Sequence, residues 1–494
     1  MSTTVTSRVR ASVSTPHEEL FLLAVTAMAE GTDQYHKTNE RFVELVRVLA
    51  LADDGWLVRF LAWLRGFDEG ASAAVVGSAE MVRTRLANGL TTSEGNRRVI
   101  DSAFTRADEP GQMLAYWYGR YGRTVPKPIR HGLADAATRL YDDAAMVEYD
   151  RSSAEVRFAD VINLVHPKAG SREQQELFRH AVARGGSSAQ IPTGMMKLRA
   201  RAALYELSIQ QRQALLDSPK ATELFGAAGM TAALLPGWLS GEAPDARAWT
   251  ALLPHMSYRD RLAHLRDLDA AGLNEQGLLG DPARIAAERI RPLTVQAARC
   301  EVTAPGRDGW LESAADAALA LVPVLTGRTL ILVDRSASMF TQIAPGSAAT
   351  VADQAAVFGA CLALRSADTT LVQFGTGHRP LPLSPGQNLT ELLGHFKEMG
   401  DGNAAAAVRA CFDRHDRIVI VTDEPHGSAW QGEHPAAAAP ADVPVYIWNV
   451  ACTPEPAAPG DAVIRGRYVF VGLSDAAFDV IPLIEAGCRA SWPF

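Results

Sequence analysis

Several features that would place a protein in a narrow class are scarce in this sequence. Its five cysteines are widely spaced and form no CxxC pair, which argues against a disulfide framework and for reduced thiols. No apolar run reaches the ~20 residues that a membrane-spanning helix needs. The first residues, "MSTTVTSRVRASVSTPHEELF", contain no apolar segment typical of a secretory signal. We therefore predict a cytoplasmic protein with no membrane partner.

Lysine is scarce as well, since only six of the 48 basic residues are lysine and the rest are arginine. Together with the heavy use of alanine, this bias is typical of proteins encoded by GC-rich bacterial genomes. The formal net charge of −8 does not by itself favour nucleic-acid binding, but a local basic face is compatible with it. The length of 494 residues predicts two or more domains.

Residues 15 to 325 read as a succession of amphipathic helices. In "STPHEELFLLAVTAMAE", Thr15 is an N-cap, Pro16 stands at the first helical position and Glu18 completes a capping box. The following segments carry apolar residues at three- and four-residue spacing, with short connections rich in Gly, Pro, Asp or Ser. This pattern predicts an irregular helical-repeat array. Residues 1–14 are predicted to be a flexible N-terminus.

The pattern changes at about residue 326. Short, almost wholly apolar segments such as "TLILV", "TTLVQF", "RIVIVT", "VPVYIWNV" and "RYVFVGL" alternate with helical segments. Continuous apolar strands that alternate with helices are typical of a parallel sheet covered on both faces. Residues 326–494 are therefore predicted to form a doubly wound, mostly parallel α/β domain.

Small oxygen-bearing side chains follow two of these strands. Asp334, Ser336 and Ser338 come directly after "TLILV", and Asp423 comes directly after "RIVIVT". Ligands of parallel sheets bind beyond the carboxyl ends of the strands. Carboxylates and hydroxyls suit Mg²⁺, Mn²⁺ or Ca²⁺ better than zinc. The pattern thus predicts a divalent-cation site. The structural alternative is a serine-rich turn in which Asp334 caps the next element.

These loops resemble the metal-ion-dependent adhesion site (MIDAS) of von Willebrand factor A domains. "LVDRSASM" is similar to its first loop, and "VIVTDEP" to its third loop. The resemblance implies a bound cation, expected to be Mg²⁺, that captures an acidic group of a partner. The second loop departs from the pattern, because "MGDGNAA" places Gly402 where the family has a threonine. Either Asp401 or Asn403 substitutes as a ligand, or the site is weakened or empty.

The helical half contains a local group of basic residues between positions 120 and 139. They are Arg120, Arg123, Lys127, Arg130, His131 and Arg139. Arginine forks suit phosphates, and aromatic side chains such as those of "YWYGRY" stack on unpaired bases. The structural alternative is that the arginines occupy solvated helix faces and that the aromatics pack in the core.

The order of the two halves resembles the Ro ribonucleoprotein autoantigen family. The resemblance is found in two segments, "GRYGRTVPKPIRHGLADAATRLY" and "FADVINLVHPKA". The second segment matches the family at Asp160, Leu164, His166 and Lys168. The resemblance implies a TROVE module over residues 15–325, which is a ring of HEAT-like helix pairs, closed by a von Willebrand A domain. It adds His166 and Lys168 to the residues expected to contact RNA.

The resemblance to the bacterial branch of this family implies a function that involves no catalysis. A monomeric ring would bind small Y-like non-coding RNA and the 3′ ends of misfolded or damaged RNA in RNA quality control or stress response, with an exoribonuclease as a partner. The helical half contains no GxSxG, HExxH, Walker or GxGxxG motif, which agrees with a protein that is not an enzyme. The alternative is a protein-interaction scaffold that recruits an acidic partner through its metal site and binds no RNA.

Overall fold

The chain forms two compact units in the computed structural model. The described residues are 15–30, 40–183, 190–273, 282–302, 308–423, 434–450 and 466–494. The helical unit comprises Thr32–Leu278 and Pro493–Phe494, and the sheet unit comprises Met1–Gly31 and Leu279–Trp492. The predicted flexible N-terminus, residues 1–14, lies outside the described residues.

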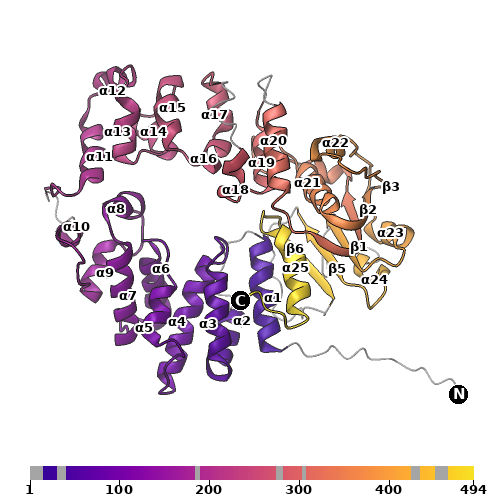
Figure 1. The fold of residues 1–494 in the computed structure, drawn as a ribbon, viewed down its shortest axis with the longest axis horizontal. Helices are drawn as coiled ribbons and strands as arrows, with labels where there is room; N and C mark the ends of the chain where they lie inside the picture. Colours follow the sequence, from indigo (N-terminus) through magenta and orange to yellow (C-terminus); the bar gives the residue numbers. More distant parts are fainter. Residues whose placement is uncertain are drawn as a thin grey trace. The chain divides into compact units, whose positions relative to one another are not determined.

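The helical unit is a succession of short helices, as the spacing of apolar residues predicted (Figure 1). Its helices are α2 (Glu40–Ala52), α3 (Asp54–Leu64), α4 (Ala71–Ala87), α5 (Asn96–Ser102), α6 (Glu109–Tyr121), α7 (Lys127–Leu140), α8 (Asp143–Tyr149), α9 (Phe158–Val165), α10 (Arg172–Ala183), α11 (Met196–Glu206), α12 (Ile209–Leu216), α13 (Ala221–Ala228), α14 (Leu235–Trp238), α15 (Ala246–Leu252), α16 (Tyr258–Ala263) and α17 (Leu265–Ala270). None of the helices that the structure describes, in either unit, has the length and apolar composition needed to cross a bilayer.

Close packing between successive helices fixes the geometry of this unit. Helix α7 lies against α5 at Gly132, where an added Cβ would stand only 2.5 Å from the Cβ of Ile100. Glycine is required here because no larger side chain fits at that distance. At the end of the chain, the ring of Phe494 lies 5.3 Å from that of Trp56 and 5.6 Å from that of Trp63. The last two residues therefore pack on α3 as part of the helical unit.

The sheet unit is built on six strands in the order β3-β2-β1-β4-β5-β6. They are β1 (Leu325–Asp334), β2 (Ser366–Phe374), β3 (His378–Pro380), β4 (Arg417–Thr422), β5 (Val445–Asn449) and β6 (Arg467–Val471). All neighbours are parallel except β3, which pairs antiparallel with β2 at the edge. The five predicted strands and their parallel arrangement are confirmed. The short edge strand was not predicted.

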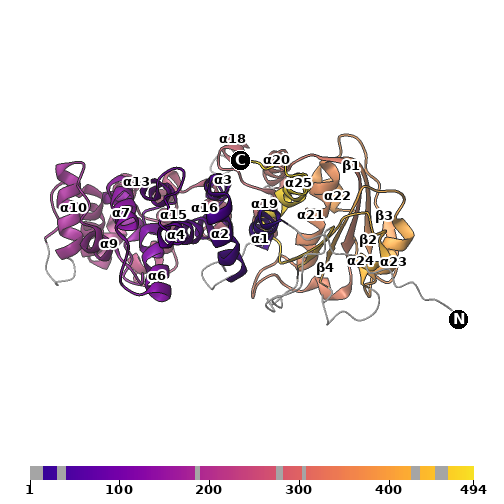
Figure 2. The same cartoon turned by 90° about the horizontal axis from the view of Figure 1, so that it is seen from below.

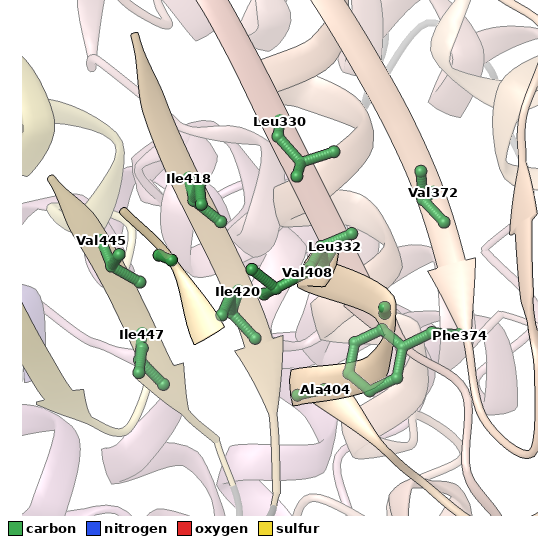
Figure 3. Packing of buried hydrophobic residues seen from close by; sticks show 12 residues of the cluster. Leu330, Leu332, Val372, Phe374, Ala404, Val408, Ile418, Ile420, Val445 and Ile447 are labelled. Carbon is green, nitrogen blue, oxygen red and sulfur yellow. The ribbon is translucent and has the colours of Figure 1, made fainter. Parts of the chain in front are cut away.

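Helices cover both faces of the sheet (Figure 2). On one face, α23 (Ala404–Cys411) and α24 (Pro435–Ala438) cover a buried cluster that includes Leu332, Val372 and Ile420 (Figure 3). On the other face, α21 (Val351–Leu364) approaches β1 closely at Gly359, where a Cβ would lie 2.4 Å from Cγ2 of Val333. Strands that are buried on both faces explain the continuous apolar segments of the sequence.

The sheet unit also includes helices that precede the first strand. They are α1 (Pro16–Glu30), α18 (Pro282–Ala287), α19 (Pro292–Cys300) and α20 (Asp308–Leu319), and the remaining helices are α22 (Leu389–Leu393) and α25 (Ala477–Gly487). Helix α1, capped by Thr15 as predicted, packs along α25, with the ring of Phe21 lying 5.2 Å from that of Trp492. The change from helices to strands occurs at Leu325, but the compact units do not divide there.

Candidate functional site

The ends of β1 and β4 bring a buried carboxylate and hydroxyl groups together. Because β1 and β4 are parallel neighbours, Asp334 at the end of β1 faces the end of β4. The Asp334 carboxylate is fully buried, and its Oδ2 accepts a hydrogen bond of 2.6 Å from Oγ1 of Thr422. Its Oδ1 accepts a bond of 2.8 Å from the backbone N–H of Ser336. The contribution of Thr422 was not predicted, although this residue directly precedes Asp423 in the sequence.

Two serine hydroxyls lie together at this edge of the sheet. The hydroxyl oxygens of Ser336 and Ser338 lie 3.2 Å apart. That separation is close to the ~3 Å between neighbouring ligands in an octahedral Mg²⁺ shell with bonds of 2.0–2.1 Å. Burial raises the pKa of Asp334, the bonds from Thr422 and Ser336 oppose the rise, and the charge of Asp423 adds to it. A bound cation would offset the unfavourable burial of these negative charges.

Arg335 lies inside the motif and turns its charge away from the site. Its Nη1 donates to the carbonyl oxygen of Ala352 at 2.7 Å, and its guanidinium lies 4.7 Å from the ring centre of Phe340. Burial lowers the pKa of Arg335, whereas the charges of Asp353 and Asp334 raise it. The one basic residue of "DRSAS" therefore serves the packing of the loop.

The second loop lies directly beside the first. The backbone N–H of Met399 donates to the carbonyl of Arg335 at 2.8 Å, and that of Ala337 to the carbonyl of Gly400 at 3.0 Å. Asn403 is the N-cap of α23, and its Oδ1 accepts a bond of 2.9 Å from the N–H of Ala406. The cap engages the amide oxygen of Asn403, whereas the side chain of Asp401 is exposed.

Two of the predicted RNA-binding arginines are engaged by carboxylates. Both Nη atoms of Arg120 donate to Glu40, at 2.8 and 2.7 Å. Arg139 donates to the carboxylate of Asp101 at 2.8 Å and to the backbone carbonyls of Asp101 and Phe104. These two side chains connect neighbouring helices and have little charge left to offer a phosphate.

The aromatic segment "YWYGRY" packs around a buried acid. Glu80 of α4 is fully buried and accepts hydrogen bonds from Nε of Arg47 at 2.9 Å and from the hydroxyl of Tyr116 at 2.6 Å. Tyr121 donates to the same carboxylate, and Arg120 lies 3.5 Å from it. The two tyrosine hydroxyls therefore hold α6 against α4.

The remaining predicted cations are exposed. Arg123, Lys127, Arg130 and His131 all lie at or just before the first turns of α7. Arg123 stacks on Tyr118, with its guanidinium 5.1 Å from the ring centre. Within the residues that the structure describes, Lys127, Arg130 and His131 make no side-chain hydrogen bond or ion pair. We call these four residues the α7 basic group.

His166 and Lys168 lie near the other end of α7. His166 is the C-cap of α9 in the left-handed conformation, with φ at 48°, and its side chain is exposed. The carbonyl oxygen of Lys168 accepts a bond of 3.1 Å from Oγ1 of Thr138. Thr138 stands about 16 Å along the helix from Lys127 at 1.5 Å per residue. The eight predicted residues thus form two separate exposed groups and two engaged arginines.

Comparison with known proteins identifies one fold. No protein-family model and no curated protein matches the sequence. The solved structure of the Ro (RSR) protein of Deinococcus radiodurans matches with a TM-score of 0.70 and 18% sequence identity, over 96% of this chain and 100% of that chain. The two chains share one fold. The Ro-like order of a helical array followed by a von Willebrand A-like sheet, predicted from the sequence, is therefore confirmed.

Proposed function

We propose that this protein binds RNA in the manner of Ro proteins and has no catalytic activity of its own. The observation that carries the proposal is the exposed α7 basic group, found in a chain whose fold matches that of a Ro protein. Its ligands would be small structured Y-like RNA and the 3′ ends of misfolded RNA, and an exoribonuclease would act on the RNA that it holds.

The charge distribution supports this proposal despite the negative net charge. Affinity for nucleic acid depends on local cations that displace counterions from phosphates. Lys127 and Arg130 are exposed and have no carboxylate partner among the described residues, so phosphate contact breaks no existing ion pair. Arg123 and Tyr118 add a guanidinium and an aromatic ring beside them.

The test is the affinity of the full-length protein for an RNA hairpin with a single-stranded 3′ end, measured by fluorescence anisotropy at several salt concentrations. The affinity of the double variant Lys127→Glu with Arg130→Glu is expected to be lower by about tenfold or more. The slope of its log affinity against log salt concentration should fall by an amount equal to about one to two phosphate contacts. Thermal unfolding should be unchanged, because both side chains are exposed.

A matched control separates a local effect from net charge. Arg379 and Arg414 are exposed residues of the sheet unit, and their double replacement by Glu changes the net charge by the same amount. This control should bind the hairpin like the wild type. Equal losses of RNA affinity in both double variants would mean that the overall charge, and not the α7 basic group, determines binding. Failure of the wild type to bind RNA at low salt would refute the proposed function.

We further propose that the sheet edge binds Mg²⁺ through Asp334, Ser336, Ser338 and Asp423, with Asp401 in place of the usual threonine. The metal would supply an open coordination position for the carboxylate of a protein partner. The close hydroxyl pair and the buried carboxylate support this assignment. Mn²⁺ and Ca²⁺ suit the same oxygen ligands.

A further inference from the structure

A large cavity lies in the helical unit, along α6. Its volume is about 970 Å³, at the upper end of the range typical for ligand sites. One wall is a single face of α6, on which Gln112, Tyr116 and Gly119 recur at three- and four-residue spacing. The other wall is the segment 151–157, which connects α8 to α9.

The segment 151–157 is held firmly in this position. Arg157 donates to both carboxylate oxygens of Asp150, at 3.3 and 2.8 Å, and the backbone N–H of Phe158 donates to the same carboxylate. Gly111 of α6 approaches the carbonyl oxygen of Val156 in this segment so closely that an added Cβ would lie 2.7 Å from that oxygen. Packing and hydrogen bonds therefore fix both walls of the cavity.

The lining combines positive charge with aromatic rings. Four arginines and two acidic residues line the cavity, and three of the arginines, Arg106, Arg120 and Arg157, are paired with carboxylates. Arg151 is exposed, and among the described residues its guanidinium makes one long hydrogen bond, of 3.4 Å, to the carbonyl of Glu148. Its guanidinium is therefore available to a phosphate. Tyr149, Tyr116 and Tyr141 supply the aromatic surface.

The buried end of the cavity has an unsatisfied polar group. Tyr141 is 1% exposed and its ring stacks on Phe158 at 3.9 Å, yet its hydroxyl has no hydrogen-bond partner among the described residues. Buried polar groups are nearly always hydrogen-bonded, so this hydroxyl can offer a hydrogen bond to a water molecule or to a ligand in the cavity. A nucleobase would provide both a ring to stack and polar edge atoms.

We infer that this cavity receives a single unstacked nucleotide of a bound RNA strand, with the base among the tyrosines and a phosphate at Arg151. The inference rests on the proposed RNA-binding function and adds a place for an unpaired base. Gly119 and Arg120 of α6 line the cavity, and Tyr118 of the same helix contacts the guanidinium of Arg123 in the α7 basic group. A strand held by Arg123 and Lys127 would thus reach the cavity within a few nucleotides.

Gly119 offers a selective way to fill the cavity. It lies within α6 without a positive φ, and a Cβ added there meets no atom within 4 Å. Gly119→Trp would project a large ring into the space, whereas Gly119→Ala changes the helix in the same way and leaves the cavity open. Both replacements favour the helix over glycine, so neither should unfold the protein.

The experiment measures the binding of two RNA probes to the full-length protein and its variants. One probe is a single-stranded oligoadenylate of about a dozen nucleotides with 2-aminopurine at its centre, and the other is a blunt RNA hairpin. Gly119→Trp is expected to weaken binding of the single strand about tenfold, consistent with the loss of one stacked base, and to abolish the change in 2-aminopurine fluorescence. Binding of the hairpin should be unchanged, and Gly119→Ala should match the wild type for both probes.

The outcomes distinguish this inference from the proposed function. If Gly119→Trp and Gly119→Ala bind the single strand equally well, the cavity does not hold a base, although RNA binding stands. If Gly119→Trp weakens both probes equally while its thermal unfolding matches that of Gly119→Ala, the cavity has no preference for an unpaired nucleotide, and the inference is also wrong. If the wild type binds neither probe, the proposed function itself fails.

Discussion

Glu80 in the helical unit and Asp334 in the sheet unit are both fully buried carboxylates, and they differ in what surrounds them. Glu80 receives Arg47, Arg120 and two tyrosine hydroxyls. Asp334 receives one threonine hydroxyl and one backbone N–H, while the adjacent Arg335 bonds to a carbonyl elsewhere. The first carboxylate is neutralised by the chain itself. The second lies among oxygen atoms, for which we propose an external cation as the neutralising partner.

The comparison separates charges that build the fold from charges that remain available. A buried ion pair that loses one partner is costly, because the other charge stays buried and uncompensated. A charge without an internal partner makes no such contribution and is free for a ligand. The same distinction divides Arg120, which Glu40 and Glu80 engage, from Lys127 on the next helix.

The largest effect is expected from Glu80→Ala. This change leaves Arg47 and Arg120 without their shared buried carboxylate and removes the acceptor of two tyrosine hydroxyls. The free energy of unfolding should fall by about 3–5 kcal/mol. Urea denaturation of the full-length protein measures it. A loss below about 1 kcal/mol would mean that solvent compensates these charges, and that the contrast with Asp334 is not one of internal pairing.

Asp334→Asn tests the other side of the comparison. In the presence of a chelator this change should cost little, because the amide oxygen can still accept the bond from the N–H of Ser336 while its NH2 donates to the hydroxyl of Thr422, which can act as an acceptor. At a Mg²⁺ concentration of about 100 times the dissociation constant, the wild type should gain about 2.7 kcal/mol, and the variant should gain none. Thermal unfolding with and without Mg²⁺, together with calorimetric titration of the metal alone, measures both. Equal stabilisation of the two proteins would place the metal elsewhere.

A pair of nearby arginines sharpens the comparison within the helical unit. Arg120→Ala removes the bidentate pair with Glu40 and should lower the free energy of unfolding by about 1–3 kcal/mol. Arg123→Ala removes only an exposed guanidinium stacked on Tyr118 and should cost less than about 1 kcal/mol. Affinity for the hairpin RNA should show the opposite order, with the larger loss in Arg123→Ala. The same order in both measurements would refute the division between structural and available charges.

These contrasts also explain what the sequence could predict. Asp334, Ser336 and Ser338 are close in the chain, and the strand before them has a distinct composition, so the fold places them together as the pattern indicated. The partner of Arg120 lies 80 positions away, and only the packing of both α2 and α6 against α4 brings it there. A basic cluster in the sequence therefore says little about which charges stay free. The edge strand β3 was missed because its three residues are all exposed and carry no apolar signal.

Sequence patterns could not predict the position of α1 or the cavity along α6, for a similar reason. The spacing of apolar residues shows that a helix has a face to bury, but not which helix will cover it. Helix α1 packs on α25 at the other end of the chain. The cavity depends on the course of the segment 151–157, which has no repeating pattern.

The smallest expected effect concerns His415, a basic residue that is buried without a charge. Its Nδ1 accepts a bond of 3.1 Å from the N–H of Asp413, and its Nε2 lies 3.0 Å from Oγ1 of Thr370. Burial and the charge of Arg328 lower its pKa below the usual 6.5, while Asp413, Asp368 and Asp416 oppose this. The folded state therefore resists protonation of this ring.

The unfolded chain takes up the proton near pH 6.5, while the folded chain takes it up only at lower pH. The stability that the neutral ring provides is therefore present above this range and is lost as the pH falls from 6.5 toward the lowered pKa. His415→Gln should lose less stability than the wild type between about pH 7 and pH 5, by on the order of 1 kcal/mol or less. Urea denaturation at a series of pH values measures the difference. Parallel curves for the two proteins would show that His415 titrates alike in the folded and unfolded chains.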